Sequence, residues 1–471
     1  MLSSCTSVSM EDNSLNNDSN LRRSMLFAFS MPAVMLGFMH APESSVQGIY
    51  AKFGGLSLTA IAGAMLFSRL FDAITYPLIG HLSDATFRKA GTRKAWIVAG
   101  TIVTVVGLWF LYRPPPNVTI TYYTIWTIVT YVGWKLTEIP YGAWALGLSS
   151  DYVQRARVQL WRSMGMMFGS LIFYVVPFLS KAFGLSETTE MTMQTLGFTA
   201  VLIAVCVPLL NLYALATVPE GGSPSTKTES SAVGDWRGTL HAVTNNRPLL
   251  HLLIAFVPVT FLNGMSAGVT YLYADSYLGL AEQLPIILLL GVPFTLLGLP
   301  FWGWVCLKYE RHHVWAVSLI LASIAYAGMG FAPVGSAGFP FMVTLYPITC
   351  FCQIAVGVTV PAMMGDIMDH ERLCTGEDRS GIYSAILAFV AKSMTGISAA
   401  IGLAVLGWLD FNAAAHSQTA TGAFAIRLVA VWLPALGMAC GAPLIWRFPI
   451  NRARQAEIHE AIKVREAAAL K

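Results

Sequence analysis

Twelve mostly apolar stretches run through the chain, each long enough to cross a lipid bilayer as a helix of about 20 residues. They lie at roughly 24–42, 57–82, 95–112, 119–148, 160–181, 194–217, 248–273, 283–306, 313–333, 338–366, 381–409 and 424–447. Of the 471 residues, 55% are hydrophobic and 11% are charged, whereas about a quarter of the residues in soluble domains are charged. The sequence therefore predicts an all-α membrane protein with twelve transmembrane helices.

The longest polar interval between these stretches is 218–247, which is rich in Gly, Pro and Ser and follows the sixth stretch. It predicts an N-terminal six-helix bundle at 22–217 and a C-terminal six-helix bundle at 248–447, joined by a cytoplasmic linker. The polar segment 1–21 has the composition of a disordered cytoplasmic tail. A second cytoplasmic tail, 448–471, follows the last stretch.

The two predicted halves contain similar segments. An acidic residue followed by arginines comes after the fourth stretch in "LSSDYVQRARVQLWR" (148–162) and after the tenth in "MGDIMDHERLCTGEDR" (364–379). Internal repeats around a site at the membrane midplane are typical of secondary transporters, which rock one bundle against the other. The repeated segments therefore favour a transporter that works by alternating access.

Lysine and arginine gather in the two tails and in alternate loops. These loops and tails contain Arg22, Arg23, Arg88, Lys89, Arg93, Lys94, Arg155, Arg157, Arg162, Lys227, Arg237, Arg247, Lys308, Arg311, Arg372, Arg379, Arg447, Arg452, Arg454, Lys463, Arg465 and Lys471. The remaining loops have few candidates, namely Lys52, Arg113, Lys181 and Arg427. Because cytoplasmic loops hold the excess of positive residues, both termini are predicted to be cytoplasmic.

Several classes of protein are disfavoured by what the sequence lacks. The seven cysteines form no C-x-x-C pair, and the nine histidines are scattered, so we expect no metal and no cofactor. The chain has no H-E-x-x-H, G-x-S-x-G or P-loop motif, which disfavours an enzyme and an ATP-driven pump. The net charge of +4 is spread along the chain and predicts no nucleic-acid partner. An integral membrane enzyme is the alternative from a different class, and a channel or receptor explains the repeats less well.

Five charged residues lie well inside the predicted spans: Arg69, Asp72, Lys135, Glu138 and Lys392. Each costs at least about 2.5–3.5 kcal/mol to insert, so such residues usually face a cavity or one another and are functional candidates. Asp72, Glu138 and Lys392 lie near the middle of three different stretches, which predicts two carboxylates facing a cation across a central cavity. Arg69 and Lys135 stand three residues before Asp72 and Glu138, so they either form structural ion pairs on one helix face or line the same cavity.

Charged residues at the predicted cytoplasmic ends of the spans have two interpretations. They are either solvated surface residues or a latch that closes the inner gate and breaks when the halves move. The gate candidates are Asp84, Arg88, Asp151, Arg155, Asp366, Asp369 and Arg372. The fourth stretch also contains Trp134, Tyr141 and Trp144 close to Glu138. These aromatic side chains either anchor the helix at the membrane interface or stack on a bound ligand.

Three segments match a known family. They are "RLFDAITYPLIGHLSDATFRKAGTRKAW", "EIPYGAWALGLSSDYVQRARVQLWR" and "MMGDIMDHERLCTGEDRSGIYSAILAFVAKSMTG". The first resembles the helix 2 signature R-x-x-D-A-x-x-D-P-x-x-G, a loop acid and G-x-[RK]-[RK]-x-W of the glycoside–pentoside–hexuronide:cation symporters. These symporters are the melibiose-permease-like branch of the major facilitator superfamily. The other two resemble its helix 4 to 5 and helix 10 to 11 regions. The resemblance covers 22–447 and implies the major facilitator fold in a bacterial inner (plasma) membrane.

The resemblance implies roles for individual residues. Asp72 matches the first carboxylate of the cation site, and Glu138 matches a helix 4 acid that contacts the sugar beside that site. Arg162 matches a helix 5 arginine that lines the cavity, and Lys392 matches a helix 11 lysine next to the cation site. The acids that match those closing the cytoplasmic side are Asp84, Asp366 and Asp369.

Two departures from the family pattern concern the coupling ion. Sodium-using members place a second carboxylate where this chain has Tyr76, and a helix 4 hydroxyl where it has Lys135. Sodium requires several hard oxygen ligands, so a lost carboxylate and an added ammonium work against it. We therefore predict that a proton, carried on Asp72 or Glu138, couples transport. Occupation of the cation position by the Lys135 ammonium, with cation-independent facilitated transport, is the alternative.

The substrate is a small organic solute in this interpretation. The family's sugar-binding acid on helix 1 has no evident counterpart in "MLFAFSMPAVMLGFM", because Glu43 stands near the outer end. The sequence therefore predicts a symporter for a sugar, a glycoside or a related compound. A facilitator or exporter of a less polar or anionic solute is the alternative, since an anion would suit Lys135, Arg162 and Lys392.

Overall fold

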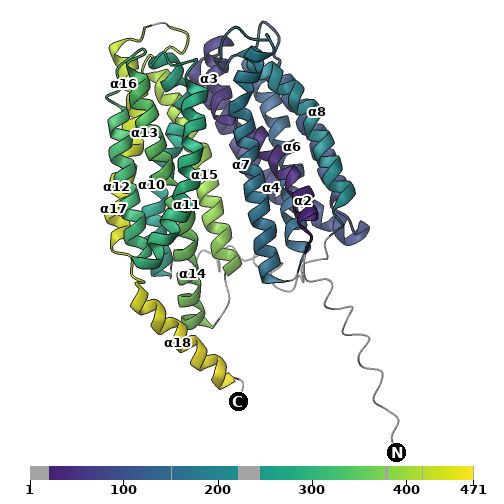
Figure 1. Ribbon diagram of the computed structural model, residues 1–471, viewed down its shortest axis with the longest axis vertical. Helices are drawn as coiled ribbons and strands as arrows, with labels where there is room; N and C mark the ends of the chain where they lie inside the picture. The colour runs from purple at the N-terminus through teal and green to yellow at the C-terminus, as the bar shows by residue number, and fades with distance from the viewer. Residues whose placement is uncertain are drawn as a thin grey trace, which may run out of the picture. The chain divides into compact units, whose positions relative to one another are not determined.

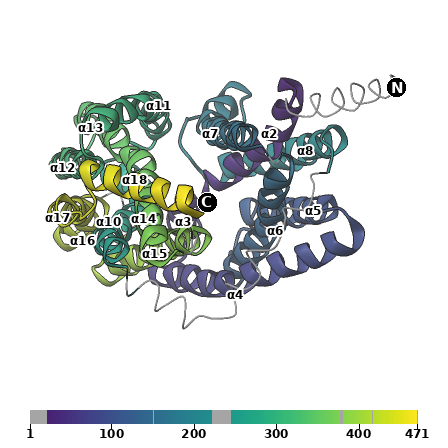
Figure 2. The same cartoon turned by 90° about the horizontal axis from the view of Figure 1, so that it is seen from below.

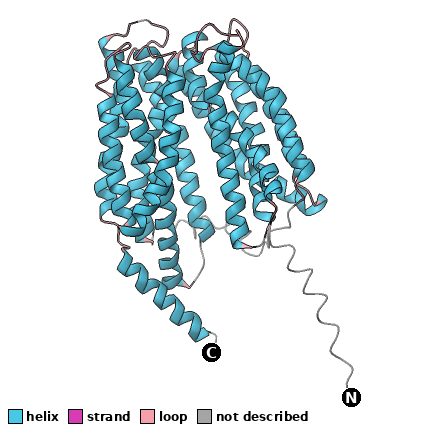
Figure 3. Cartoon of the chain, in the orientation of Figure 1, coloured by secondary structure: helices cyan, strands magenta, loops and turns pink. Residues whose placement is uncertain are grey.

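The structure is a computed structural model that describes residues 21–149, 151–220, 246–376, 380–415 and 417–469, together with Thr244. Within these residues the backbone forms helices and turns and no β-strand (Figure 3). The first half of the chain contains α2 (Arg23–His40), α3 (Glu43–Phe53), α4 (Leu58–Ala90), α5 (Lys94–Tyr112), α6 (Ile120–Gly147), α7 (Tyr152–Ala182) and α8 (Met193–Thr217). The predicted linker 218–247 and the tail 1–21 lie almost entirely outside the described residues.

The second half contains α10 (Arg247–Leu272), which continues as the π-helix η1 (Tyr273–Tyr277), and then α11 (Leu284–Lys308) and α12 (Arg311–Met329). The next helices are α13 (Gly338–Gln353), α14 (Ala355–Thr375) and α15 (Ser380–Trp408). The last are α16 (Ala420–Arg427), the π-helix η2 (Leu428–Trp432), α17 (Leu433–Trp446) and α18 (Arg452–Ala469) (Figure 1).

Among the described residues, eleven helical segments are long and apolar enough to cross a membrane. The predicted all-α membrane fold is therefore confirmed. The predicted fourth span, α6, is helical over 28 residues but is not one of the eleven, because it carries Lys135, Glu138 and many Thr, Tyr and Trp side chains. Three spans run well beyond their predicted ends: the first continues to Phe53, the second to Ala90 and the tenth to Thr375.

The helices form two compact units, which we describe separately. Unit 1 holds the described residues within Met1–Glu43, Leu70–Glu187 and Thr192–Thr226, and unit 2 holds those within Ser44–Arg69, Thr188–Met191 and Lys227–Lys471. The short segments Ser44–Arg69 and Thr188–Met191 thus belong to the unit that contains the later helices. The division into two six-helix halves at 218–247 stays a prediction.

In unit 1, α5 packs on α6 and α8, and α2 packs on α7 and α8 (Figure 2). Small residues bring these helices close together. A Cβ atom added to Gly100 of α5 would overlap Thr137 of α6, and one added to Gly133 of α6 would overlap the backbone of Thr104 on α5. Small residues at helix contacts allow this close approach in membrane proteins, and the contact fixes which face of α6 is turned away from α5.

In unit 2, α10 packs on α15 and α17, while α12 packs on α13 and α17 (Figure 2). The tenth predicted span comprises α13 and α14, which meet at Ile354, a residue that keeps a right-handed helical backbone conformation. The C-terminal tail is not without structure, since α18 packs on α14. These contacts surround the cavity of unit 2 that is described below.

Candidate functional site

The buried charges of unit 1 meet between α4 and α6. The Lys135 ammonium forms an ion pair with the Asp72 carboxylate, and its Nζ also donates to the Asp72 backbone oxygen at 3.3 Å. Both side chains are largely buried, with 5% of Lys135 and 13% of Asp72 exposed. Lys135 Nζ lies 5.8 Å from the centre of the Tyr76 ring. The structure thus brings together three of the residues predicted to form the cation-coupling site.

The spacing of charges along each helix had pointed to other pairs, Arg69 with Asp72 and Lys135 with Glu138. The ion pair of Lys135 with Asp72 joins two helices instead. Arg69 belongs to unit 2, where a Cβ atom added to Gly396 of α15 would lie 2.8 Å from its side chain. Glu138 is half-buried on α6, one turn beyond Lys135. A cation-coupling or sugar-binding role for Glu138 stays a prediction.

Lys392 lies on α15 in unit 2, one helical turn before Gly396, and is exposed within the structure. Lys392 was predicted to face Asp72 and Glu138 across a central cavity. Because these two acids belong to unit 1, that arrangement stays a prediction. The same holds for a Lys392 contact with substrate.

Two of the predicted pocket aromatics have partners inside unit 1. The Tyr141 hydroxyl donates to the Phe29 backbone oxygen at 2.6 Å, and the two rings stack with centroids 4.8 Å apart. Trp144 packs edge-on against Phe29 at 5.3 Å and donates its Nε1 to the Pro219 backbone oxygen at 2.9 Å. These contacts hold α6 to α2. A ligand contact by Tyr141 or Trp144 stays a prediction, because both side chains are almost completely buried.

Arg162 of α7 lies beside Tyr141, with its guanidinium carbon 5.3 Å from the ring centre. Its Nε is buried and has no hydrogen-bond partner among the described residues. A buried donor without a partner costs about 1–3 kcal/mol, and in a transporter a ligand or water can satisfy it. Arg162 therefore remains a candidate for substrate binding.

Trp134 belongs to a polar aromatic cluster that the sequence did not predict. Its indole ring lies 4.1 Å from the His40 ring, and its buried Nε1 has no hydrogen-bond partner among the described residues. The Glu43 carboxylate accepts from the Tyr131 hydroxyl at 2.8 Å and lies 3.7 Å from His40 Nδ1. Glu43 is therefore an acid of the first span that reaches α6, although its place in the sequence suggested the outer end.

The gate candidates of unit 1 make contacts with nearby residues. The Arg93 Nη2 donates to Asp84 at 3.0 Å. Asp151 caps α7 by accepting from the Gln154 backbone N–H at 2.8 Å, and Arg155 donates to the Ser149 backbone oxygen at 2.7 Å. Such caps stabilise a helix start by about 1 kcal/mol. A gate role for these residues and for the exposed Arg88 stays a prediction.

The gate candidates of unit 2 bind α18. Asp366 of α14 accepts from Arg311 Nη1 at 2.5 and 2.6 Å and also from the Gln455 side chain of α18. His459 of α18 lies 2.9 Å from the Asp369 carboxylate. Arg372 is exposed on the last turn of α14. These acids therefore hold the C-terminal helix, a contact that the sequence did not indicate, and their role in closing the inner side stays a prediction.

A second buried charge cluster lies in unit 2. Lys52 Nζ of α3 is 2.7 Å from Glu190 Oε1 and 2.7 Å from Asp275 Oδ2 of η1. The Asp275 side chain is fully buried, and its Oδ1 has no hydrogen-bond partner among the described residues. The sequence places Lys52 in a loop and therefore does not predict this cluster. One feature of the sequence does point to it, because Asp275 is an acidic residue directly after the predicted span 248–273.

Within the described residues, no group of three or more His, Cys, Asp or Glu side chains is arranged to hold a metal ion. What unit 1 does offer is a buried ammonium, two carboxylates, a guanidinium and aromatic rings around α6. Such a set can bind a polar organic solute and can exchange protons.

Comparisons with known proteins show the family to which the chain belongs. The sequence profile of the MFS/sugar transport protein family matches residues 26–452. YjmB, an uncharacterised symporter of Bacillus subtilis, is 23% identical over 407 residues, which are 83% of this chain and 84% of that protein. A glucuronide carrier protein homolog of Escherichia coli is 22% identical over 443 residues, covering 92% and 91% of the two chains.

The fold is also found among solved transporters. The inward open structure of the xylose transporter XylE from Escherichia coli aligns with a TM-score of 0.60 at 16% identity, covering 93% of this chain and 99% of that one. The predicted resemblance to the cation symporters of the major facilitator superfamily is confirmed. Because the profile matches nearly the whole length, the chain belongs to the MFS/sugar transport protein family.

Proposed function

We propose that this membrane transporter is a symporter that moves a small sugar-like organic solute by alternating access and is driven by protons rather than sodium ions. The family supports the transport of a sugar-like solute. Homologues of similar length are a symporter and a glucuronide carrier homolog. The choice of proton rests on one observation, the ion pair between Lys135 and Asp72.

The ammonium of Lys135 takes the place beside Asp72 that a sodium ion would need. Two unit positive charges 4 Å apart repel by about 4 kcal/mol at an effective dielectric constant of 20. Sodium would also lack a carboxylate ligand at position 76, where the neutral ring of Tyr76 lies near the lysine. Both effects disfavour a bound sodium ion next to Asp72.

A proton is compatible with the same arrangement. Asp72 is paired with the Lys135 ammonium, and Glu138 lies one helical turn further along α6, so one proton would bring these two carboxylates and the ammonium to neutrality. Protonation of Asp72 would remove its charge and weaken the ion pair with Lys135. The resulting freedom between α4 and α6 is a physical means of coupling protonation to movement, because buried ion pairs are strongly destabilised when one charge is lost.

Uptake into sealed proteoliposomes tests the proposal. With an inward proton gradient we expect a radiolabelled sugar or glycoside substrate to accumulate above its outside concentration, and we expect an uncoupler to abolish the accumulation. A sodium gradient alone should give no accumulation. Sodium-driven uptake that is insensitive to the uncoupler would refute the choice of proton.

The ion pair also favours a second candidate function, cation-independent facilitated transport. In that case the Lys135 ammonium acts as a permanent counter-ion of Asp72, and no external cation is needed. The same assay separates the two, because a facilitator equilibrates the substrate across the membrane and is unaffected by the uncoupler.

A further inference from the structure

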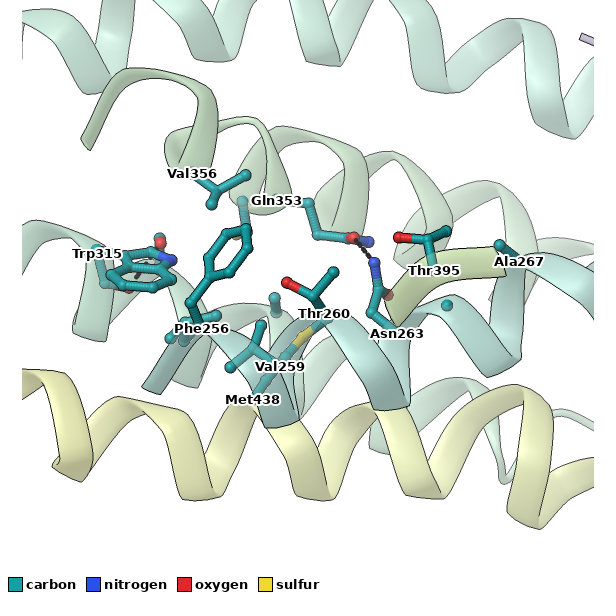
Figure 4. A pocket seen from close by; sticks show the side chains of 15 residues that line it. Phe256, Val259, Thr260, Asn263, Ala267, Trp315, Gln353, Val356, Thr395 and Met438 are labelled. Carbon is teal, nitrogen blue, oxygen red and sulfur yellow. Dashed lines mark hydrogen bonds between the residues drawn. The ribbon is translucent and has the colours of Figure 1, made fainter. Parts of the chain in front are cut away.

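Unit 2 contains a cavity of about 220 Å³ among α10, α12, α15, α17 and the junction of α13 with α14 (Figure 4). Two of its polar side chains bind each other, since Asn263 Nδ2 donates to Gln353 Oε1 at 2.9 Å (Figure 4). A proton-driven transporter needs a side chain that gains and releases a proton, and near neutral pH carboxylates and imidazoles usually do so. The described residues that line this cavity offer neither a carboxylate nor an imidazole.

Unit 1 contains two ionisable side chains that the ion pair of Lys135 and Asp72 does not use. His40 and Glu43 stand three residues apart within the first span, which runs from Arg23 to Phe53. The His40 Nδ1 atom lies 3.7 Å from Glu43 Oε2, and the two side chains are 29% and 24% exposed. Because a charged group that faces lipid is costly, we expect the exposed side of this pair to face water.

The carboxylate of this pair is held from α6. Glu43 Oε1 accepts from the Tyr131 hydroxyl at 2.8 Å, while Oε2 is the oxygen that lies near His40. The Tyr131 side chain is itself buried among the helices of unit 1. The hydroxyl therefore fixes the carboxylate beside the imidazole and leaves one of its oxygens available to a protonated ring.

The imidazole of the pair rests on an indole ring. The ring centres of His40 and Trp134 are 4.1 Å apart, and the buried Trp134 ring also packs against Tyr131 with the ring centres 5.2 Å apart. A cation within about 6 Å of the centre of an indole ring is attracted to it. A proton on His40 would therefore gain two favourable neighbours, the Glu43 carboxylate and the Trp134 ring.

The elements around α2 carry further ionisable groups. α8 has no Asp, Glu, His, Lys or Arg, and α7 has no acid and no histidine. The ionisable residues of α5, α6 and α7 that stand nearest to this level of α2 are Tyr112, Tyr131, Lys135, Glu138, Arg162, Tyr174 and Lys181. Tyr112 lies close enough to Glu43 to interact with its charge. Among the described residues, Glu43 is the carboxylate within ion-pair distance of His40.

We propose that His40 and Glu43 form a proton-binding pair that is separate from Asp72 and takes part in coupling. The proposal rests on the proposed function and adds a second place where a coupling proton is held. A proton from water adds to the lone pair of an imidazole nitrogen, and the pair changes from one negative charge to neutral. Trp134 directly precedes Lys135. The ring under His40 and the ion pair with Asp72 thus belong to one turn of α6, through which protonation of one site affects the other.

Nitrogen-15 NMR of the full chain in lipid bilayers, with the label in histidine, measures imidazole protonation without any substrate. The chain contains nine histidines, and the signal that His40→Gln removes is the signal of His40. We expect this signal to change from the neutral to the imidazolium form as the pH is lowered from about 8 to about 5, the range in which histidine commonly changes its charge. A His40 signal that keeps one form throughout this range would overturn the proposal.

Glu43→Gln keeps the size of the side chain and removes its charge. Proton binding at His40 should weaken by about threefold to tenfold, because a carboxylate beside an imidazole favours the protonated ring, so the midpoint of the NMR titration should move to lower pH. The matched control is Glu187→Gln, which removes an exposed acid of unit 1 outside the cluster and should leave the midpoint unchanged. An unchanged midpoint in Glu43→Gln, or an equal change in both variants, would show that Glu43 does not hold the proton on His40.

Transport shows whether this proton is used. The probe is the radiolabelled sugar that wild-type proteoliposomes accumulate under an inward proton gradient. His40→Gln should lower this accumulation at least about tenfold and keep counterflow exchange within about twofold of the wild type, because exchange requires no net proton movement. His81→Gln, at an exposed histidine of α4, should keep both activities. Wild-type accumulation by His40→Gln would overturn the proposal, and so would an equal loss of accumulation and exchange, which indicates a structural role.

The two measurements separate this proposal from the proposed function. If wild-type proteoliposomes accumulate no sugar under a proton gradient, the proposed function fails, and the NMR titration alone decides whether His40 and Glu43 bind a proton. If the wild type accumulates sugar and the His40 signal does not titrate, the pair is wrong and proton-driven transport stands.

Discussion

The Lys135 ammonium contacts Asp72 from α6, and Tyr76 stands one turn further along α4. These three side chains combine a positive charge, a negative charge and a neutral ring where a sodium site needs several oxygen ligands. If these side chains determine which cation couples transport, substituting them should change the coupling cation. Substitution of these residues is therefore the most direct test of the coupling ion.

The double variant Tyr76→Asp with Lys135→Thr supplies the carboxylate and the hydroxyl and removes the ammonium. We expect sodium to increase substrate affinity by about tenfold in this variant, which corresponds to about 1.4 kcal/mol, and to have no effect on the wild type. Substrate titration with sodium chloride against choline chloride measures the effect. The control is Tyr76→Phe, which should stay insensitive to sodium. A double variant that binds substrate with no response to sodium would contradict the assignment.

The charges of this site could be found from the sequence, because ionisable residues inside apolar spans are rare and costly. Their pairing could not be found. Spacing along one helix suggested Glu138 for Lys135, whereas the observed ion pair with Asp72 depends on the rotation of α6 relative to α4. That rotation is fixed by contacts such as Gly133 on Thr104, which one sequence does not reveal.

At the scale of elements, the segments that the sequence placed least well are α3 and η1. α3 continues the first span beyond the turn after His40, and η1 is a five-residue π-helix at the end of α10. Short π-helices are often found at functional sites. Here the two elements, with the segment 188–191, bring Lys52, Glu190 and Asp275 together.

Loss of the Lys52 charge should destabilise unit 2. Lys52→Met leaves the fully buried Asp275 carboxylate without its counter-ion, and breaking a buried ion pair in this way typically costs about 3–5 kcal/mol. We expect a clearly lower midpoint of thermal unfolding for this variant in detergent. Lys308→Met, at the exposed end of α11, should leave the midpoint unchanged.

The double variant Lys52→Met with Asp275→Asn shows whether the charge is responsible. It removes both members of the buried pair, so its unfolding midpoint should lie above that of Lys52→Met alone. Equal midpoints for the single and double variants would mean that the lysine contributes by packing rather than by its charge.

At the scale of the whole molecule, the alternation of basic and non-basic loops was visible in the sequence, and the boundaries of the compact units were not. The boundary between Arg69 and Leu70 falls inside the continuous helix α4. Composition marks loops and linkers, so it points to 218–247 and carries no signal for a boundary within a helix. Helix existence follows from local apolar composition, whereas the grouping of helices follows from contacts between distant residues.

Orientation in the membrane is the property of the whole molecule that the basic loops predict. The excess of Lys and Arg in alternate loops and in both tails predicts that both termini are cytoplasmic. Green fluorescent protein fused after Lys471 in Escherichia coli should therefore fluoresce, and alkaline phosphatase fused there should be inactive. Alkaline phosphatase fused after Asn117, in a predicted outer loop, should be active, because its disulfides form only in the oxidising periplasm. The opposite pattern at both positions would reverse the orientation and move the basic loops to the outside.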